Sequence, residues 1–288
     1  MATTDFGLRL GLTPEEFLVH GWVGGLRWNP ASGPFTVLLH RDPIRDTMLS
    51  FAGERDPTSR QVWGGVMANS AAIIGNHSRG NTGFYGKLDY QDIQGKDVAK
   101  NSRIEANVGS YFKVYRTNMG ELTIGLNLTG LHYDKNLRYF TLGQGGYFSP
   151  QEYFLFNVPA QWTGTVNSKL QYSISASLGV QHFTEDSSPY FPTDAARQSS
   201  SGLSYPSYTN TSGNYNLSFR TTYQIAPQWL GGFFFDVNNA REYRSVNAGL
   251  YLKFLLDPRP TPPDLNVTTV PDWTGVSPFD VSQSNRPR

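Results

Sequence analysis

The thirteen residues "KLQYSISASLGVQ", from Lys169 to Gln181, alternate strictly between polar and apolar side chains. Successive side chains of a β-strand point to opposite faces, so this period indicates a strand with one apolar and one polar face. The apolar positions begin at Leu170 and recur at every second residue to Val180. Strands of globular proteins usually have only about five or six residues. The stretch therefore predicts a long strand whose two faces meet different environments.

The same alternation recurs along most of the chain. It is clear in 103–114, 122–129, 215–225 and 246–254. It is weaker in 19–29, 35–49, 62–76, 83–93, 152–164 and 229–238, and a partial strand covers 5–10. These segments predict an all-β, antiparallel fold with 11–12 strands.

The predicted connections alternate between short and long. Short turns are expected near 29–33, 77–82, 117–120, 166–168 and 226–228. Longer loops are expected near 11–17, 50–61, 94–101, 135–151 and 185–212. Consecutive antiparallel strands are joined at alternating ends, so the short turns all fall at one end of the sheet. Tight turns at one end and longer loops at the other are typical of outer-membrane β-barrels.

A membrane environment also explains the two faces of the strands. In lipid every backbone polar group must be paired, and a closed barrel achieves this with strands. Its apolar face meets lipid and its polar face lines a wet lumen. The sequence thus predicts a transmembrane outer-membrane β-barrel over residues 5–256, in the bacterial outer membrane. A soluble β-sandwich acting as a binding module is the alternative, although sandwich strands are typically shorter.

Composition and motifs exclude several functional classes. The 24 basic and 23 acidic residues nearly cancel, so no basic excess indicates nucleic-acid binding. Cysteine is absent, which excludes disulfides and thiolate metal sites. The sequence has no apolar run of ~18 residues and no nucleophile elbow, zinc-protease motif, EF-hand spacing or dinucleotide fingerprint. We therefore expect no enzymatic activity, no metal and no cofactor.

The two ends of the chain differ in character. The segment "NAGLYLKF", Asn247–Phe254, resembles the terminal-strand signal read by the machinery that assembles outer-membrane barrels. Residues 257–288 contain seven prolines, which predicts an extended or disordered tail. The sequence begins without a secretory signal. Its predicted strands number eleven plus one partial strand, whereas bacterial single-chain barrels usually have an even number. The barrel is therefore expected to be truncated at its N-terminus.

One long loop is unusually aromatic. The stretch "RYFTLGQGGYFSPQEY", Arg138–Tyr153, follows neither the helical nor the strand period. Its five rings belong to Tyr139, Phe140, Tyr147, Phe148 and Tyr153.

This loop also carries a family resemblance. The quoted matches are "LHYDKNLRYFTLGQGGYFSPQEY" (131–153), "SFAGERDP" (50–57), "WGGV" (63–66), "GWVGG" (21–25) and "EDSSPYFP" (185–192). Together they resemble the C-terminal domain of the cellulose synthase operon protein C family, over about residues 19–256. The resemblance implies a sixteen-stranded outer-membrane barrel that exports β-1,4-glucan made by an inner-membrane cellulose synthase complex. It also implies outer-membrane lipid and a preceding periplasmic region of tetratricopeptide repeats as partners, and a domain that is not enzymatic.

The aromatic loop is the first candidate glucan contact. Rings can stack on the apolar faces of sugars and bind a chain through weak, repeated contacts. We expect the five rings to lie at the outer mouth or to fold into the lumen, where they touch or gate the polymer. The alternative is an ordinary loop packed on itself.

Polar residues on the predicted lumen face are the second candidate set. They are Arg103, Glu105, Asn107, Lys113, Asn127, Gln171, Gln181 and Arg220. They can form hydrogen bonds with a neutral sugar polymer, or they can merely hydrate the lumen and pair across strands. Their mixed charges argue against an anionic cargo. A general porin, or an exporter of another exopolysaccharide, is the alternative function.

Four tryptophans near predicted strand ends suit an aromatic girdle at a membrane interface. They are Trp28, Trp63, Trp162 and Trp229. Their preference for β-strands is the alternative explanation.

Overall fold

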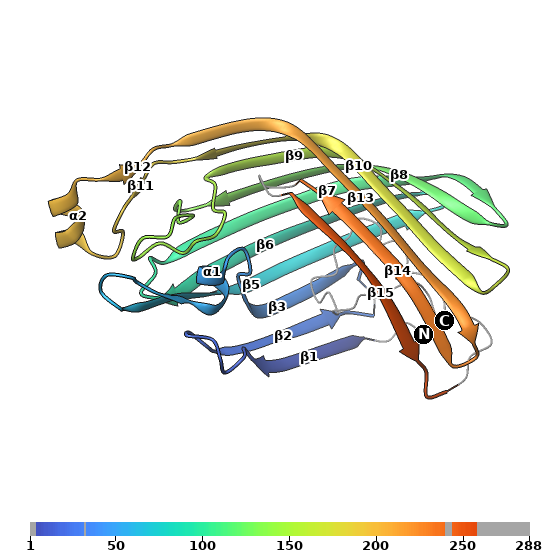
Figure 1. Cartoon of the computed structure of the whole chain (residues 1–288). Helices are drawn as coiled ribbons and strands as arrows, with labels where there is room; N and C mark the ends of the chain where they lie inside the picture. The colour runs from blue at the N-terminus through green and yellow to red at the C-terminus, as the bar shows by residue number, and fades with distance from the viewer. Residues whose placement is uncertain (1–3, 32, 240–243, 258–288) are drawn as a thin grey trace.

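The structure, a computed structural model, describes residues 4–31, 33–239 and 244–257. Its main feature is a single antiparallel sheet of thirteen strands. Figure 1 shows this sheet rolled, with β13 to β15 crossing obliquely in front of the strands behind them. The predicted all-β, barrel-type fold is confirmed.

Twelve of the strands follow one another along the sheet. They are β1 (Asp5–Leu12), β2 (Trp22–Asn29), β3 (Phe35–Pro43), β5 (Val62–Arg79), β6 (Thr82–Lys96), β7 (Asn101–Thr117), β8 (Gly120–Tyr133), β9 (Glu152–Val166), β10 (Leu170–Glu185), β13 (Tyr208–Ala226), β14 (Trp229–Asn238) and β15 (Ser245–Phe254). The thirteenth strand, β4 (Glu54–Arg55), pairs only with β5. The strands β11 (Ser188–Pro189) and β12 (Ser204–Tyr205) form a separate small sheet.

Neighbouring strands in the sheet are also neighbours along the chain. Only the short elements between β3 and β5 and between β10 and β13 interrupt this order. All of the alternating stretch 169–181 except Lys169 lies in β10, which pairs with β9 and β13 without a register shift. A slip of one residue would turn every side chain to the opposite face, so this continuous register preserves the alternation predicted from the sequence.

The two faces of the sheet have opposite polarity. On the outer face, as we call it, large apolar side chains are exposed. They include Leu88, Tyr90, Ile104, Val108, Leu126, Leu128, Phe154, Phe156, Leu178 and Val180. On the opposite, inner face, polar side chains such as Asp89, Asn127 and Gln181 are buried. Soluble proteins rarely expose a contiguous apolar surface of this kind, so the arrangement argues against a soluble sandwich.

The connections separate by length as predicted. Short turns lie at one end of the sheet, the turn end, at 30–34, 80–81, 118–119, 167–169 and 227–228. Long connections lie at the opposite end, the loop end, at 13–21, 44–61, 134–151 and 186–207. The predicted long loop at 94–101 is wrong. Strand β6 continues to Lys96 and β7 begins at Asn101, so the connection is short.

The predicted strand over 35–49 is too long. Strand β3 ends at Pro43, because proline has no N–H to donate to a ladder. Helix α1 (Met48–Ala52) follows, and Thr47 is its N-cap. The Thr47 hydroxyl accepts from the Ser50 N–H at 3.2 Å, and the Ser50 hydroxyl accepts from the Thr47 N–H at 3.0 Å. This capping box starts a helix at Met48, within the range over which the apolar pattern predicts a strand.

Aromatic side chains gather on the outer face at the turn end. The pairs, with their centroid distances, are Phe6–Trp28 at 6.4 Å, Trp28–Phe35 at 6.1 Å, Tyr115–Trp162 at 5.9 Å and Trp229–Phe254 at 5.0 Å. These positions fit a girdle containing Trp28, Trp162 and Trp229. Trp63 does not belong to it, because it is the second residue of β5, at the loop end, and is buried.

Strands β1 and β15 are the two edges of the sheet, and each pairs on one side only among the described residues. The predicted terminal-strand segment 247–254 lies in β15 and pairs with β14. The proline-rich tail, from residue 258 onward, lies outside the described residues. No helix in the described part of the chain is long and apolar enough to cross a membrane.

Candidate functional site: the inner wall and its plug

The connection 134–151 packs on the inner face at the loop end, and we call it the plug. Its Tyr147 is 1% exposed and belongs to a cluster of buried apolar side chains. The other members come from the strands, from α1, from the plug itself and, with Val98, from the connection between β6 and β7. They include Leu49, Trp63, Val66, Ile93, Leu131, Tyr133, Leu137, Tyr153 and Phe183. A cluster of this size gives the plug a fixed position, as a hydrophobic core does in a soluble domain.

Hydrogen bonds join the plug to the connection 44–61, which contains α1 and which we call the α1 connection, and to the start of β5. They run from Thr47 Oγ1 to the Gly146 carbonyl (2.7 Å), from the Phe148 N–H to Asp46 Oδ2 (3.0 Å) and from Trp63 Nε1 to the Gln144 carbonyl (3.2 Å). Gly146 has φ 67°, a left-handed conformation that favours glycine. A Cβ on Gly146 would lie 3.0 Å from the Leu49 and Thr47 side chains. Glycine is therefore needed where the plug meets α1.

A second set of contacts joins the plug to the connection 186–207. The buried Gln144 amide donates to Ser188 Oγ at 2.9 Å and to the Pro189 carbonyl at 2.8 Å. Asn136 Nδ2 donates to the Asp186 carbonyl at 2.8 Å. Arg138 forms an ion pair with Glu185, whose carboxylate is fully buried at the end of β10. Three long connections thus interlock at the loop end.

The five predicted rings separate into two groups. Tyr147, Phe148 and Tyr153 pack inward: Phe148 meets Phe183 edge-on at 5.1 Å, and Tyr153 Oη donates to Gln181 Oε1 at 3.3 Å. Burial raises the pKa of Tyr147, whose hydroxyl accepts from Asn101 Nδ2 at 3.0 Å. By contrast, the remaining two rings are within reach of solvent. Phe140 is 57% exposed and Tyr139 is half-buried.

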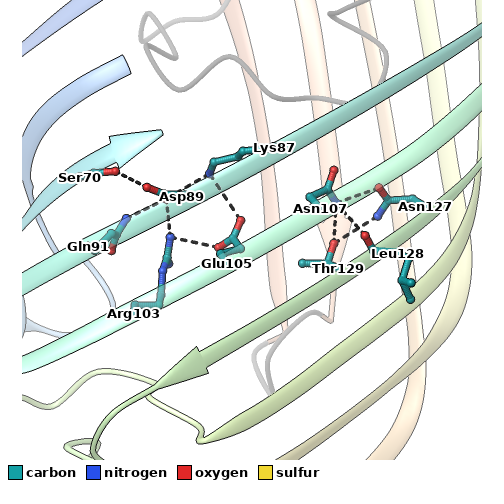
Figure 2. A network of polar contacts seen from close by, with 10 residues as sticks. All are labelled: Ser70, Lys87, Asp89, Gln91, Arg103, Glu105, Asn107, Asn127, Leu128 and Thr129. Atoms are coloured by element: carbon teal, nitrogen blue, oxygen red, sulfur yellow. Dashed lines mark hydrogen bonds and ion pairs between the residues drawn. The ribbon is translucent and has the colours of Figure 1, made fainter. Parts of the chain in front are cut away.

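Charged residues form a compact group on the inner face of β6 and β7, as Figure 2 shows. Asp89 is its centre and is 1% exposed. Its carboxylate accepts from Arg103 at 2.9 Å, lies 3.3 Å from Lys87 Nζ and also accepts from Ser70 and Gln91. Glu105 lies 3.1 Å from Arg103 and 3.5 Å from Lys87. We call Lys87, Asp89, Arg103 and Glu105 the charge cluster.

Neutral polar groups follow toward the turn end. Asn107 Nδ2 donates to Asn127 Oδ1 at 2.9 Å and to Thr129 Oγ1 at 2.6 Å, as drawn in Figure 2. The Tyr85 hydroxyl donates to the same Asn127 oxygen at 2.9 Å. The inner wall therefore presents amides and hydroxyls beside a charge cluster in which two positive and two negative groups cancel.

The eight predicted polar residues all lie on the inner face. Beyond those described above, Lys113 pairs with Glu121 at 3.0 Å, and Arg220 lies 3.5 Å from Asp236. Gln171 lies opposite Thr222, and Gln181 Nε2 donates to Ser212 Oγ at 3.2 Å. Their common face is confirmed, and their contact with a glucan stays a prediction.

The sequence interpretation did not single out Lys87 and Asp89, which organise the charge cluster. Both lie in 83–93, where the alternation is weaker, at the positions that point to the inner face. The alternation itself could therefore have identified them. Leu49, which packs against the plug, and Gln144, within the plug, had no such signal. No group of three or more metal-ligating side chains occurs in the described ranges.

Comparison with known proteins supplies the family. The pattern described as "Cellulose synthase operon protein C C-terminus" matches residues 1–257. A cellulose synthase operon protein C from Xanthomonas axonopodis pv. citri (strain 306) is 36% identical over 273 residues, which is 88% of this chain and 18% of that protein. The protein of the same name from Escherichia coli (strain K12) is 32% identical over 260 residues, 85% of this chain and 22% of that protein.

The chain thus spans about a fifth of the length of these relatives. The match covers every described strand, the plug and the inner wall. The chain therefore belongs to the cellulose synthase operon protein C family, in its C-terminal region.

Proposed function

We propose that this chain forms part of a bacterial outer-membrane pore that exports cellulose. The observation that carries the proposal is the inverted polarity of the long strands, with an exposed apolar outer face and a hydrogen-bonding inner face. An apolar outer face suits contact with lipid, and a polar inner face suits a wet conduit. The names of the relatives connect such a conduit to cellulose synthesis.

The chemistry of the inner wall suits a neutral polymer. A β-1,4-glucan has hydroxyl groups but no charge, so a wall of amides and hydroxyls can exchange hydrogen bonds with it. The charge cluster is internally paired, so it has no large excess of either sign to hold a cargo. Weak, repeated contacts allow a polymer to move, whereas tight binding would stop it.

The aromatic pairs support an orientation. Tryptophan and tyrosine favour the membrane–water interface, and barrel turns at the periplasmic side are short. The turn end would then face the periplasm, and the loop end with its plug would face outward. In this orientation a glucan leaves past the plug.

The proposed partners follow from this orientation. They are the β-1,4-glucan, the lipid of the outer membrane, a periplasmic region of tetratricopeptide repeats and the inner-membrane cellulose synthase complex. The proposed role is transport, with no enzymatic step in this region.

A chimeric exporter tests the proposal. Residues 1–257 of this chain would replace the matching region of the Xanthomonas relative, in cells deleted for that relative. We expect cellulose to reappear outside the cells, measured as glucose released by cellulase from the washed cell surface. Heat-modifiable migration of the chimera in gels would verify that the barrel has assembled. An assembled chimera that passes ions and small sugars but secretes no cellulose would instead support a general porin.

Phe140 offers a test of the aromatic hypothesis. Phe140→Ala in the chimera is expected to reduce secreted cellulose by about two- to tenfold, because one sugar–ring contact of roughly 0.5–1.5 kcal/mol is lost. Phe154→Ala is the matched control, since Phe154 is 56% exposed but lies on the outer face. Equal secretion by the two variants would remove Phe140 from the exit path.

A further inference from the structure

Three tyrosines form a stack between two of the interlocked connections. The rings of Tyr139 and Tyr205 are nearly parallel (6°) with centroids 3.5 Å apart. Those of Tyr190 and Tyr205 are also nearly parallel (10°) at 4.1 Å. Two rings cannot stack on one face of Tyr205 at these distances, so Tyr205 lies between the other two. Removing its ring would leave a slot one ring thick between Tyr139 and Tyr190.

The two walls of the slot and the ring between them are anchored differently. Tyr139 belongs to the plug, which the buried cluster around Tyr147 holds in place. Tyr190 and Tyr205 flank α2 (Ala195–Ser201), a helix with no buried residue. The segment from α2 to Tyr205 can therefore shift without exposing an apolar core, whereas the plug and Phe191, which packs against the cluster beside Tyr190, cannot.

Few polar contacts hold Tyr205 in its place. Its hydroxyl donates to Thr141 Oγ1 at 3.4 Å, a long hydrogen bond, and β12 is only two residues long. Apart from the pairing of β12 with β11, the stacking of its ring is the main contact of Tyr205 with Tyr139 and Tyr190. A flat-faced ligand that offered the same two stacking contacts would compete directly with it.

We propose that Tyr139 and Tyr190 bind a glucopyranose unit of the emerging chain in the place that the Tyr205 ring fills when no chain is present. The proposal rests on the proposed function. An equatorially substituted pyranose ring has two apolar faces, so it can stack between two tyrosines as an aromatic ring does. Tyr205 is thus a placeholder. When its ring leaves, the two stacking contacts are lost, and the sugar that enters makes two similar contacts with Tyr139 and Tyr190. Such an exchange suits a conduit because neither state is held tightly.

The proposal predicts effects of opposite sign at two rings of one stack. In the purified chimera, Tyr205→Ala removes the competitor, so cellohexaose is expected to bind about three- to tenfold more tightly. Tyr190→Ala removes one wall of the slot, so cellohexaose is expected to bind more weakly by a similar factor. Tyr205→Phe keeps the ring and is expected to bind like the parent. Isothermal titration with cellohexaose provides these affinities.

A purely structural stack predicts a different pattern. In that case Tyr205→Ala and Tyr190→Ala would both weaken binding or both leave it unchanged, and either result would overturn the placeholder role. Cellulose secretion by the chimera separates this failure from failure of the proposed function. Continued secretion without the opposite-sign pattern would reject the slot alone. The opposite-sign pattern with maltohexaose but not with cellohexaose would reject cellulose as the ligand of the slot.

Discussion

Tyr147→Ala is expected to destabilise the plug by about 3–5 kcal/mol, the usual cost of truncating a large buried aromatic side chain. The ring is 1% exposed, with buried neighbours on the strands and on α1. Its removal leaves a cavity where those elements meet. It also deprives Asn101 Nδ2 of one of two acceptors, the Tyr147 hydroxyl at 3.0 Å, and leaves the Lys135 carbonyl at 2.8 Å. The destabilised plug should leave the inner face for part of the time, so the loop end should pass more ions.

Conductance across planar bilayers and denaturant unfolding in detergent measure the two effects. Tyr147→Phe is the matched control, because it keeps the ring and loses only the hydroxyl. It is expected to cost only about 1 kcal/mol and to conduct like the parent. Parent-like conductance from Tyr147→Ala, in protein that unfolds at lower denaturant, would show that the plug does not obstruct ion flow.

The second large effect is expected from Asp89→Asn. This change leaves Arg103 and Lys87 with only Glu105 as a carboxylate partner within the charge cluster. Breaking a buried ion pair by removing one partner costs about 3–5 kcal/mol. The cluster also changes from two positive and two negative groups to two and one, so the pore should shift toward anions. Reversal potentials in a salt gradient measure that shift.

Asp134→Asn is the control for this prediction. It makes the same chemical change in the plug, where the Asp134 side chain is 59% exposed and lies 3.4 Å from Lys135. An exposed pair contributes little, so a change within about 0.5 kcal/mol and an unchanged reversal potential are expected. An Asp89→Asn variant with unchanged selectivity would mean that ions do not pass close to the charge cluster.

The strands were predictable because each experiences two environments along its whole length. The contrast between those environments imposes a period of two residues. This period can be read from a local stretch such as 169–181 without knowledge of its neighbours in space. The parity of that period also placed Arg103, Asn127 and Gln181 on one face. The strand predicted over 35–49 ends at Pro43. Beyond it the side chains no longer alternate between two environments, and capping by Thr47 starts a helix.

The plug was not predictable in the same way. Its position depends on Leu49 and Trp63, which are distant in sequence and follow no period shared with Tyr147. The sequence therefore suggests a girdle position for Trp63, whereas in the structure its indole N–H donates to the Gln144 carbonyl. The sequence identifies the rings of the aromatic loop. It does not indicate which of them, such as Phe140, stay exposed, because that depends on the same distant contacts.

The wall and the plug also differ in when they can form. Each strand of the wall pairs with the next wall strand along the chain, so each pairing closes a shorter chain loop than the contacts between the plug and the α1 connection do. The plug's hydrogen bonds instead join residues 99 and 102 positions apart, at Thr47–Gly146 and Asp46–Phe148. Closing such long chain loops costs more conformational entropy than pairing neighbouring strands. We expect these contacts to form once the intervening strands are aligned. We therefore expect the wall to assemble first, around an open loop end, and the plug to close that end last.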